Sequence, residues 1–302
     1  MSDLSLRHAG LPASSAGAAV HDFWILLKPR VMSLVVFTGA VGLLLAPGGQ
    51  IHPVQAVIAI LCIAVGSGAS GAINMWYERD IDALMRRTRD RPLPAGRMTP
   101  GEALGFGIVL ATASVLIMAV ALNLVAAALL AAAILFYVVV YTIALKRRTP
   151  QNIVIGGAAG AFPPVIGWAA ATGDVGWPAL ALFALIFLWT PPHFWSLALY
   201  RAADYANAGI PMLPVVAGPR ATRIQILIYT LLLWPVSLAP TLIGTAGWLY
   251  GAAAILLDLA FTALAMRLMV RRDDAAARTM FGFSLVYLFL LFALLATDHV
   301  LR

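Results

Sequence analysis

Three side chains that carry oxygen ligands recur at every fourth residue in the segment NMWYERDID. They are Asn74, Glu78 and Asp82. In an α-helix, residues four apart drift by only about 40° around the axis and rise by about 6 Å, so one face carries an amide and two carboxylates in a row. Mg²⁺ takes such oxygens and bridges to phosphate oxygens. The spacing therefore favours a Mg²⁺ site. It equally fits a solvated helix end at which the acids pair with Arg79 and Arg86.

Basic residues follow these acids closely. The next segment contains Arg86, Arg87, Arg89, Arg91 and Arg97, and a second basic cluster, in YTIALKRRTPQN, contains Lys146 and Arg147. Guanidinium and ammonium groups bind phosphate oxygens, so these residues beside a metal would form a diphosphate site. Each of them can also be explained as a basic flank of a membrane span. Asn74, Glu78 and Asp82 together are called the acid row. Asp80 points away from it and is a weaker candidate for a metal ligand.

The elements that must position these residues are membrane spans. The chain has 302 residues, of which 62% are hydrophobic and 11% charged, whereas soluble proteins have about a quarter charged residues. Crossing a membrane takes about 20 apolar residues. Nine runs of that kind predict an all-α polytopic membrane protein, near 29–47, 53–76, 102–122, 124–145, 152–171, 178–200, 223–244, 247–270 and 279–297.

The basic residues indicate how these nine spans are oriented. With the N-terminus in the cytoplasm, 19 of the 20 Lys and Arg residues fall on the cytoplasmic side and only Arg302 falls outside. This asymmetry follows the positive-inside rule. It predicts a cytoplasmic N-terminus and an external C-terminus, and it explains the net charge of +7 without a nucleic-acid partner.

The chain divides into two parts. Residues 1–21 are small and polar without a signal-peptide core, and they predict a disordered cytoplasmic leader. Residues 22–302 predict one transmembrane domain. Its single cysteine, Cys62, excludes a disulfide within the chain. Gly and Pro inside the helices, as in IGGAAGAFPPVIGW and LWTPPHFW, free backbone groups that need partners in protein or a wet cavity, which favours a bundle with an interior cavity.

With these motifs in view, the chain resembles the UbiA superfamily of intramembrane prenyltransferases and, within it, the protoheme IX farnesyltransferases (heme O synthases). Asn74, Glu78 and Asp82 match the first Asn-x-x-x-Asp-x-x-x-Asp motif of the superfamily, with Glu in place of the first Asp. The second motif, Asp-x-x-x-Asp, is reduced to Tyr200 and Asp204. The segments PPHFW and DYANAGIPMLP point to the heme branch.

This resemblance implies a UbiA-like bundle of nine helices around a central cavity that opens to the cytoplasm. It implies farnesyl transfer from farnesyl diphosphate to a vinyl group of heme b with addition of water, Mg²⁺ as cofactor, a bacterial inner membrane and a downstream heme-modifying enzyme. The implied catalytic residues are Asn74, Glu78, Asp82 and Lys146; the metal ligands are Asn74, Glu78, Asp82 and Asp204; the diphosphate ligands are Arg86, Arg91, Lys146, Arg147 and Arg201.

The heme side of the reaction is assigned to His193 and Trp195. His193 lies about 10 Å from the cytoplasmic end of its span, and imidazole is a common axial ligand of heme iron. It can instead contact a heme propionate or a backbone group freed by Pro191 and Pro192. The cation left by the departing diphosphate would need electron-rich aromatic rings around it. The candidates for these rings are Trp76, Tyr77, Tyr137, Tyr141 and Trp195. Asp258, in the middle of a span, either faces the bundle and accepts a hydrogen bond or marks a misplaced helix.

Three alternatives remain at this point. A UbiA-type enzyme with an aromatic acceptor for quinone synthesis differs only in its acceptor residues, above all at His193. A CDP-alcohol phosphotransferase would carry Asp-Gly-x-x-Ala-Arg before its acids, where this chain has GSGASGAI. An ion-coupled transporter would place its acids near the middle of the membrane, whereas most acids here lie at the predicted cytoplasmic rim.

Overall fold

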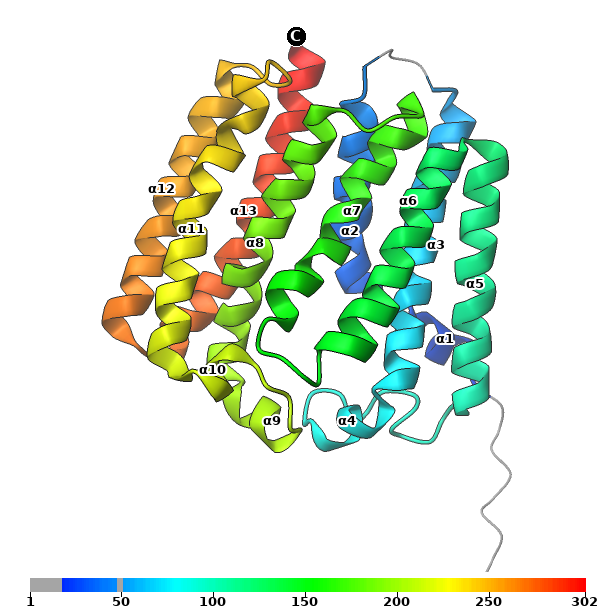
Figure 1. Ribbon diagram of the computed structural model, residues 1–302, viewed down its shortest axis with the longest axis vertical. Coiled ribbons are helices and arrows are strands. Elements are labelled where there is room, and N and C mark those ends of the chain that lie inside the picture. Colours follow the sequence, from blue (N-terminus) through cyan, green and yellow to red (C-terminus); the bar gives the residue numbers. More distant parts are fainter. Residues whose placement is uncertain (1–17, 48–50) are drawn as a thin grey trace, which may run out of the picture.

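The computed structural model describes residues 18–47 and 51–302, and every regular element in these residues is a helix (Figure 1). The long helices are α2 (Pro29–Leu44), α3 (Pro53–Tyr77), α5 (Pro100–Ala121), α6 (Leu124–Leu135), α7 (Asn152–Thr172), α8 (Trp177–Tyr200), α11 (Gly218–Leu242), α12 (Trp248–Arg271) and α13 (Asp274–Leu301). The shorter ones are α1 (Val20–Leu26), α4 (Arg79–Leu84), α9 (Ala202–Asn207), α10 (Leu213–Val216) and the π-helix η1 (Phe136–Leu145), which continues α6. The predicted all-α fold is confirmed.

The first predicted span differs from the other eight. Eight stretches of the described chain are helical, long and apolar enough to cross a membrane, with α6 and η1 counted as one. Helix α2 alone has only 16 residues, which is short for a span. It qualifies together with α1, to which it is bent by 53°. Lys28, at the bend, takes the left-handed conformation with φ 52°. Counted together, α1 and α2 form a bent candidate for the ninth span of the described chain.

Helix α1 ties the start of the domain to a loop beyond α4. Most of the predicted leader, residues 1–17, lies outside the described residues, and Val20 already begins α1. Asp22 on this helix is buried, and its Oδ1 accepts a hydrogen bond from Arg97 Nε at 2.9 Å. This ion pair joins the segments on either side of α3.

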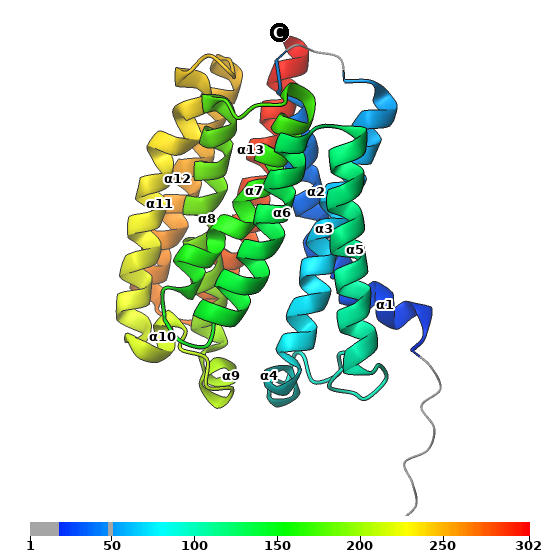
Figure 2. The same cartoon turned by 45° about the vertical axis from the view of Figure 1, so that its right-hand side comes forward.

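The helices form two groups that lie side by side (Figures 1 and 2). Helices α3, α5, α6 and α7 pack around one apolar core, and α8, α11, α12 and α13 pack around another. Helices α7 and α8 join the two groups, and α2 packs against α3, α7 and α13. Because α2 touches both groups, it closes the bundle.

Glycines allow α2 and α7 to approach each other closely. A Cβ atom added at Gly42 would lie 2.1 Å from the carbonyl oxygen of Pro164, and one at Gly167 would lie 2.0 Å from that of Gly39. Both distances are far below van der Waals contact, so the two backbones touch directly. Small residues at such crossings are how helices associate where no hydrophobic effect drives them together.

One end of the bundle carries the charged loops. Helices α4, α9 and α10 lie at the end opposite the C-terminus (Figure 1). The same end holds most of the basic residues, in the segments 79–97, 146–148, 201–223 and 267–278. The predicted one-sided distribution of charge is thus present in the fold.

Asp258 links three helices of the second group. Its carboxylate on α12 is buried and accepts hydrogen bonds from Ser237 Oγ on α11 at 2.5 Å and from the Tyr287 hydroxyl on α13 at 2.6 Å. The hydroxyl of Tyr250 donates to the carbonyl of Ser237 at 2.8 Å. Of the two readings of Asp258, the one in which it faces the bundle is therefore confirmed.

Candidate active site

The acid row spans the junction between α3 and α4. Asn74 belongs to the last turn of α3, Glu78 stands between the helices and Asp82 belongs to α4. The amide of Glu78 donates to the carbonyl of Asn74 at 2.9 Å, and the amide of Asp82 donates to the carbonyl of Glu78 at 2.8 Å. The four-residue spacing therefore continues through the break, and all three residues are at most 3% exposed.

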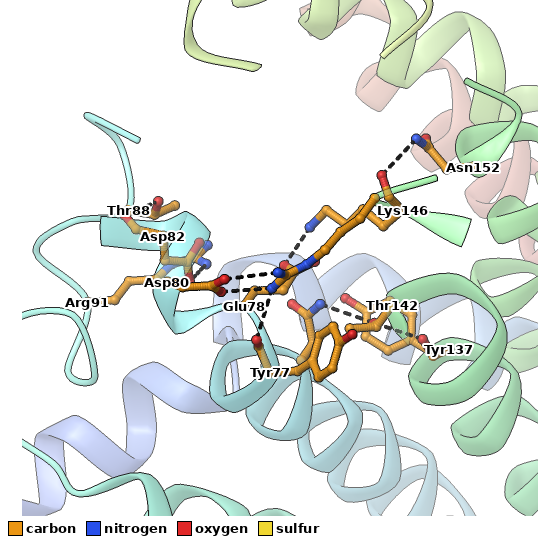
Figure 3. A network of polar contacts seen from close by, with 12 residues as sticks. Tyr77, Glu78, Asp80, Asp82, Thr88, Arg91, Tyr137, Thr142, Lys146 and Asn152 are labelled. Carbon is orange, nitrogen blue, oxygen red and sulfur yellow. Dashed lines mark hydrogen bonds and ion pairs between the residues drawn. The ribbon is translucent and has the colours of Figure 1, made fainter. Parts of the chain in front are cut away.

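A cationic side chain binds each member of the row. Lys28 Nζ donates to Asn74 Oδ1 at 2.8 Å, Lys146 Nζ to Glu78 Oε2 at 2.5 Å and Arg91 Nη1 to Asp82 Oδ2 at 2.6 Å. Figure 3 shows Lys146 and Arg91 approaching the two carboxylates. The alternative of a solvated helix end paired with Arg79 and Arg86 is wrong, because the acids are buried. Arg79 donates instead to the carbonyl of Trp76 at 2.7 Å.

The oxygen atoms of the row suit a hard cation. Glu78 Oε1 is buried and has no hydrogen-bond partner in the part of the chain that the structure describes. This is costly for a carboxylate unless something else binds it. Two carboxylates and one amide oxygen are ligands of the kind that Mg²⁺ prefers. Within the described residues no three His, Cys, Asp or Glu side chains are grouped to hold a metal. A cation here would therefore take ligands from Asn74, Glu78 and Asp82 and complete its shell with substrate oxygens.

The π-helix η1 forms the wall that faces this row. The Thr142 hydroxyl accepts a hydrogen bond from Asn74 Nδ2 at 3.1 Å and donates to the carbonyl of Tyr137 at 2.9 Å. Lys146 follows the last turn, where its amide donates to the carbonyl of Tyr141 at 2.9 Å. π-helical turns are rare and frequent at functional sites. Here the turn places Thr142 and Lys146 toward different members of the row.

Arg147 lies beside the row and clamps Asp80. Its Nη1 and Nη2 donate to the two carboxylate oxygens of Asp80 at 2.9 and 2.7 Å, and Nη2 also donates to the carbonyl of Tyr77 at 3.2 Å. Hydrogen bonds from Arg147 lower the pKa of Asp80 below its usual value. Burial acts to lower the pKa of Lys146, but the charge of Glu78 outweighs it and the pKa is raised. At neutral pH Asp80 is thus ionised and Lys146 is protonated.

A pocket of about 260 Å³ opens beside this clamp. It is lined by Asp80, Ile81, Leu84, Arg147 and residues 208–210. It lies where α4 meets the loop after α9, at the end of the bundle predicted to be cytoplasmic. Of the predicted diphosphate ligands, Arg91, Lys146 and Arg147 therefore gather at the row or its rim.

The other two predicted diphosphate ligands lie apart from the row. Arg86 is exposed. Arg201 Nη1 lies 3.4 Å from Asp204 Oδ2 on α9, and its guanidinium carbon lies 5.8 Å from the ring centre of Tyr200. No contact in the described chain joins Asp204 to Glu78 or Asp82, so the remnant of the second motif forms an ion pair of its own.

His193 is held by an aromatic stack between α8 and α13. Its ring stacks on Trp189, with centres 4.3 Å apart, and on Phe281, with centres 4.8 Å apart. Nδ1 lies 2.7 Å from Ser284 Oγ, and that hydroxyl donates its proton to the carbonyl of Phe281 at 2.6 Å. Nδ1 must therefore be the donor to Ser284, and Nε2 carries the lone pair that a metal ligand needs.

Trp195 and His193 turn to different neighbours. Trp195 packs edge to face against Tyr229 on α11, with ring centres 5.4 Å apart, and its buried Nε1 has no hydrogen-bond partner among the described residues. Residues two apart on a helix point about 200° apart. The two predicted heme residues therefore lie on different sides of α8.

Sequence reasoning missed three residues that hold the site together. Lys28 was counted only as a basic flank, and Thr142 and Ser284 were not singled out. Lys28 and Thr142 lie 46 and 68 residues from their partner Asn74. The position of Lys28 directly before Pro29, at a break between apolar segments, was the available signal. No pattern pointed to Ser284.

Comparisons with known proteins agree with this architecture. Residues 35–294 match the model of the UbiA prenyltransferase family. A protein named protoheme IX farnesyltransferase from Acidiphilium cryptum is 56% identical over 99% of this chain and 100% of its own length. One of the same name from Rhizorhabdus wittichii is 59% identical, over 96% of this chain and 97% of its own length.

Solved structures share the fold at low sequence identity. One, described as digeranylgeranylglyceryl phosphate synthase in membranes, has a TM-score of 0.79 and 16% identity, covering 94% of this chain and 99% of its own. A UbiA homolog from Archaeoglobus fulgidus bound to DMAPP and Mg²⁺ has a TM-score of 0.68 and 19% identity, covering 91% of this chain and 99% of its own. The helical arrangement is therefore that of these proteins.

Proposed function

The chain belongs to the UbiA prenyltransferase family, and from this premise we propose that it transfers the farnesyl group of farnesyl diphosphate to a vinyl group of heme b. It is an integral membrane enzyme. Water adds to the vinyl group in the same reaction, and the products are heme O and diphosphate. The relatives named protoheme IX farnesyltransferase, 55–59% identical over at least 95% of this chain, support heme as the acceptor.

The binding of the diphosphate by this protein is inferred from the acid row and from the basic side chains that contact it. Asn74, Glu78 and Asp82 are buried together, and Lys28, Lys146 and Arg91 each contact one of them. When bound by this row, Mg²⁺ would neutralise the charge that develops on the diphosphate. The A. fulgidus homolog bound to DMAPP and Mg²⁺ supports this assignment. A second ion at Asp204 has less support, because Arg201 already occupies that carboxylate.

In the first step the bond between C1 of the farnesyl group and the diphosphate oxygen breaks, and its electron pair leaves with the diphosphate. We assign the stabilisation of this leaving group to the charges of Lys146 and Arg91, and Arg147 would add to it from the rim of the row. Arg86 and Arg201 would join only after their loops move toward the row. The positive charge left on the allylic carbons needs dry, electron-rich walls. The rings of Tyr137 and Tyr141, with centres 5.4 Å apart on η1, supply such a surface beside the row.

In the second step the terminal vinyl carbon of heme attacks C1 of the farnesyl cation. The new carbon–carbon bond leaves a positive charge on the vinyl carbon next to the pyrrole ring. A water oxygen captures this charge and releases a proton. Atoms and charge balance when the diphosphate and the proton are counted as products.

His193 is the residue that we assign to the iron of heme b. Its hydrogen bond to Ser284 presents Nε2 as the free nitrogen, and the stack of Trp189 and Phe281 fixes the ring. Trp195, on another side of α8, would contact the macrocycle only if heme lay between α8 and α11. The acid row and His193 lie on different helix groups, so the two substrates would enter from different sides of the interior.

Product analysis tests the proposed reaction directly. Membranes that contain the protein, supplied with heme b, farnesyl diphosphate and Mg²⁺, are expected to form a farnesylated and hydrated heme, detected by mass spectrometry. EDTA is expected to stop the reaction and added Mg²⁺ to restore it. A prenylated product that forms only with an aromatic acid as acceptor would reject heme and favour a quinone precursor instead.

Absorption spectroscopy tests the role of His193. His193→Ala is expected to shift the Soret band of bound heme, and Ser284→Ala to weaken heme binding while keeping the ligated spectrum. Exogenous imidazole is expected to restore the wild-type spectrum of His193→Ala. An unchanged spectrum in His193→Ala would show that the iron has another ligand and leave His193 as a packing residue.

The site of action follows from topology. We assign the protein to a bacterial inner membrane with the acid row at the cytoplasmic face, a cytoplasmic N-terminus and Arg302 outside, and we expect a downstream heme-modifying enzyme to take the product. A reporter active only outside the cytoplasm, fused after Arg302, is expected to be active. An inactive reporter there, with an active one in the loop after α4, would invert this topology.

A further inference from the structure

Three arginines converge on a pocket at the edge of the bundle, apart from the acid row. Arg220 and Arg223 extend from the first two turns of α11, and Arg272 directly follows the last residue of α12. With Ile224 and Met269 they line a pocket of about 420 Å³. Helices α11 and α12 pack against each other and form one edge of the bundle in both views (Figures 1 and 2).

These three arginines lack the acidic partners that other basic residues have. No carboxylate in the described residues lies within ion-pair distance of Arg220, Arg223 or Arg272, whereas Arg91, Lys146 and Arg147 each pair with an acid. Arg272 Nε donates to the carbonyl of Met269 at 3.3 Å. The carboxylate of the adjacent Asp273 accepts the amide of Ala276 as the cap of α13. The pocket therefore carries positive charge that no acidic side chain of the described residues neutralises by an ion pair.

Topology alone does not require such convergence. Arg267 and Arg271 also lie near the end of α12 and satisfy the positive-inside rule, yet they do not line the pocket. A planar guanidinium presents paired N–H groups that match phosphate oxygens. Basic pockets between transmembrane helices on the cytoplasmic side are a known form of lipid headgroup site.

The walls above the pocket favour a lipid over a free anion. Ile224 is part of the lining and is 39% exposed, and Ile228 and Leu231 continue the same exposed face along α11. On α12, Met266 and Val270 are also exposed. A phosphate held by the arginines would thus have apolar side chains directly beside it, in the direction in which acyl chains run.

We propose that the pocket formed by Arg220, Arg223 and Arg272 binds the phosphate of an anionic phospholipid, with the acyl chains lying along the exposed faces of α11 and α12. The site is independent of the farnesyl transfer proposed above. It would anchor the second helix group to the negatively charged leaflet and fix its depth in the membrane.

Native mass spectrometry of the detergent-purified protein tests this site. After incubation with equal amounts of phosphatidylglycerol and phosphatidylcholine, the wild type is expected to retain mainly phosphatidylglycerol. The double variant Arg223→Gln/Arg272→Gln is expected to lose about tenfold or more of that preference, since a charged hydrogen bond contributes about 1.5–3 kcal/mol. The matched control, Arg267→Gln/Arg271→Gln, removes the same charge from the same end of α12 and is expected to keep it.

Three outcomes would overturn the proposal. They are equal retention of the two lipids by the wild type, equal losses in the pocket and control variants, and displacement of the lipid by millimolar inorganic phosphate or diphosphate, which would identify a free anion as the occupant. Thermal melting in neutral detergent checks that the variants are folded. If the double variant does not fold, the single variants Arg220→Gln and Arg272→Gln, at exposed side chains, carry the same comparison.

Discussion

At the scale of single residues, charge is balanced unevenly around the acid row. Two carboxylates, Glu78 and Asp82, lie among three cationic side chains that contact the row. The site therefore presents a basic side chain to each member of the row before any ligand binds. Basic side chains placed in this way attract a diphosphate. Lys146 is central to this effect because it binds Glu78 and follows the aromatic wall.

Replacing Lys146 is expected to affect both activity and stability. Lys146→Met leaves the buried Glu78 carboxylate without its cation, which costs about 3–5 kcal/mol for a broken buried pair. The loss of one charge aimed at the leaving group lowers kcat by about 10²–10³. Turnover in membranes and thermal melting measure the two effects. Arg148→Met, at an exposed residue two positions further along the chain, is the control. Equal losses in both variants would contradict a specific role for Lys146.

The ion pair between Asp80 and Arg147 predicts a pH dependence. The pKa of Asp80 is lowered in the folded protein, so the unfolded chain binds this proton more readily and the contribution of the pair is fully present above the unfolded value near 4. It is lost as the pH falls through the lowered folded pKa. The difference in melting temperature between wild type and Asp80→Asn is expected to stay constant from pH 8 to 5 and to shrink below that. A difference that shrinks between pH 8 and 6 would show that another group controls the pair.

At the scale of the helices, close backbone contact positions α2 against α7. Gly42 and Gly167 leave no room for a side chain, while Gly160 on the same helix α7 has nothing within 4 Å of an added Cβ atom. Helix α2 begins directly after Lys28, and α7 packs against α3 and η1. The crossing therefore fixes the distance between Lys28 and the acid row.

Alanine substitutions along α7 are expected to have opposite effects. Gly167→Ala forces the two helices apart and is expected to reduce the yield of folded protein severely. Gly160→Ala is expected to be neutral or to stabilise by about 0.5–1 kcal/mol, because alanine loses less entropy than glycine in a helix. Size-exclusion profiles and thermal melting distinguish the two. A well-folded Gly167→Ala would mean that α2 and α7 can separate without loss.

The helices were largely predictable from the sequence because their length and apolarity are local properties. The predicted spans 53–76 and 102–122 correspond to α3, Pro53–Tyr77, and α5, Pro100–Ala121. The break at Lys28 and the π-helical half of the fourth span were not predicted. A shift of hydrogen bonds from the fourth to the fifth residue leaves no signature in composition.

The candidate site was predictable only in part, for a similar reason. The row of Asn74, Glu78 and Asp82 is a local spacing and could be read directly. The cationic residues that bind the row lie 9 to 68 positions from their partners in the sequence. From the sequence alone, several other basic residues were equally good candidates for these contacts. Arg86 was thus ranked with Arg91, although only Arg91 contacts the row. Which arginine turns inward depends on packing that no single segment encodes.

At the scale of the whole molecule, hydrogen bonds hold the second helix group together where the hydrophobic effect is absent. Asp258 joins α11, α12 and α13 through Ser237 and Tyr287. The helices also pack through a large apolar core. Within a membrane such polar links give modest energy and strong specificity, because the unpaired groups would face hydrocarbon.

Removing Asp258 is expected to destabilise the protein without changing its chemistry. Asp258→Ala leaves the buried Tyr287 hydroxyl without its acceptor and leaves Ser237 Oγ with only the carbonyl of Trp234, at 3.0 Å. It is expected to cost about 1–3 kcal/mol. The melting temperature is expected to fall, and the KM for farnesyl diphosphate to stay unchanged because no contact joins Asp258 to the acid row. Tyr287→Phe removes one of the two bonds and is expected to lose less. A changed KM with an unchanged melting temperature would indicate a functional role instead.

The contact between α2 and α13 has a consequence for how the protein is made. Phe37 on α2 and Phe289 on α13 pack with ring centres 5.0 Å apart, although about 250 residues separate them in the sequence. The ribosome therefore synthesises Phe289 long after Phe37. At a synthesis rate of about 5–20 residues per second, the first span waits on the order of tens of seconds for its last neighbour. During that interval its inner face is covered by lipid or by the insertion machinery. Truncations that stop before α13 are therefore expected to insert and yet remain open, and to become substrates of membrane proteases.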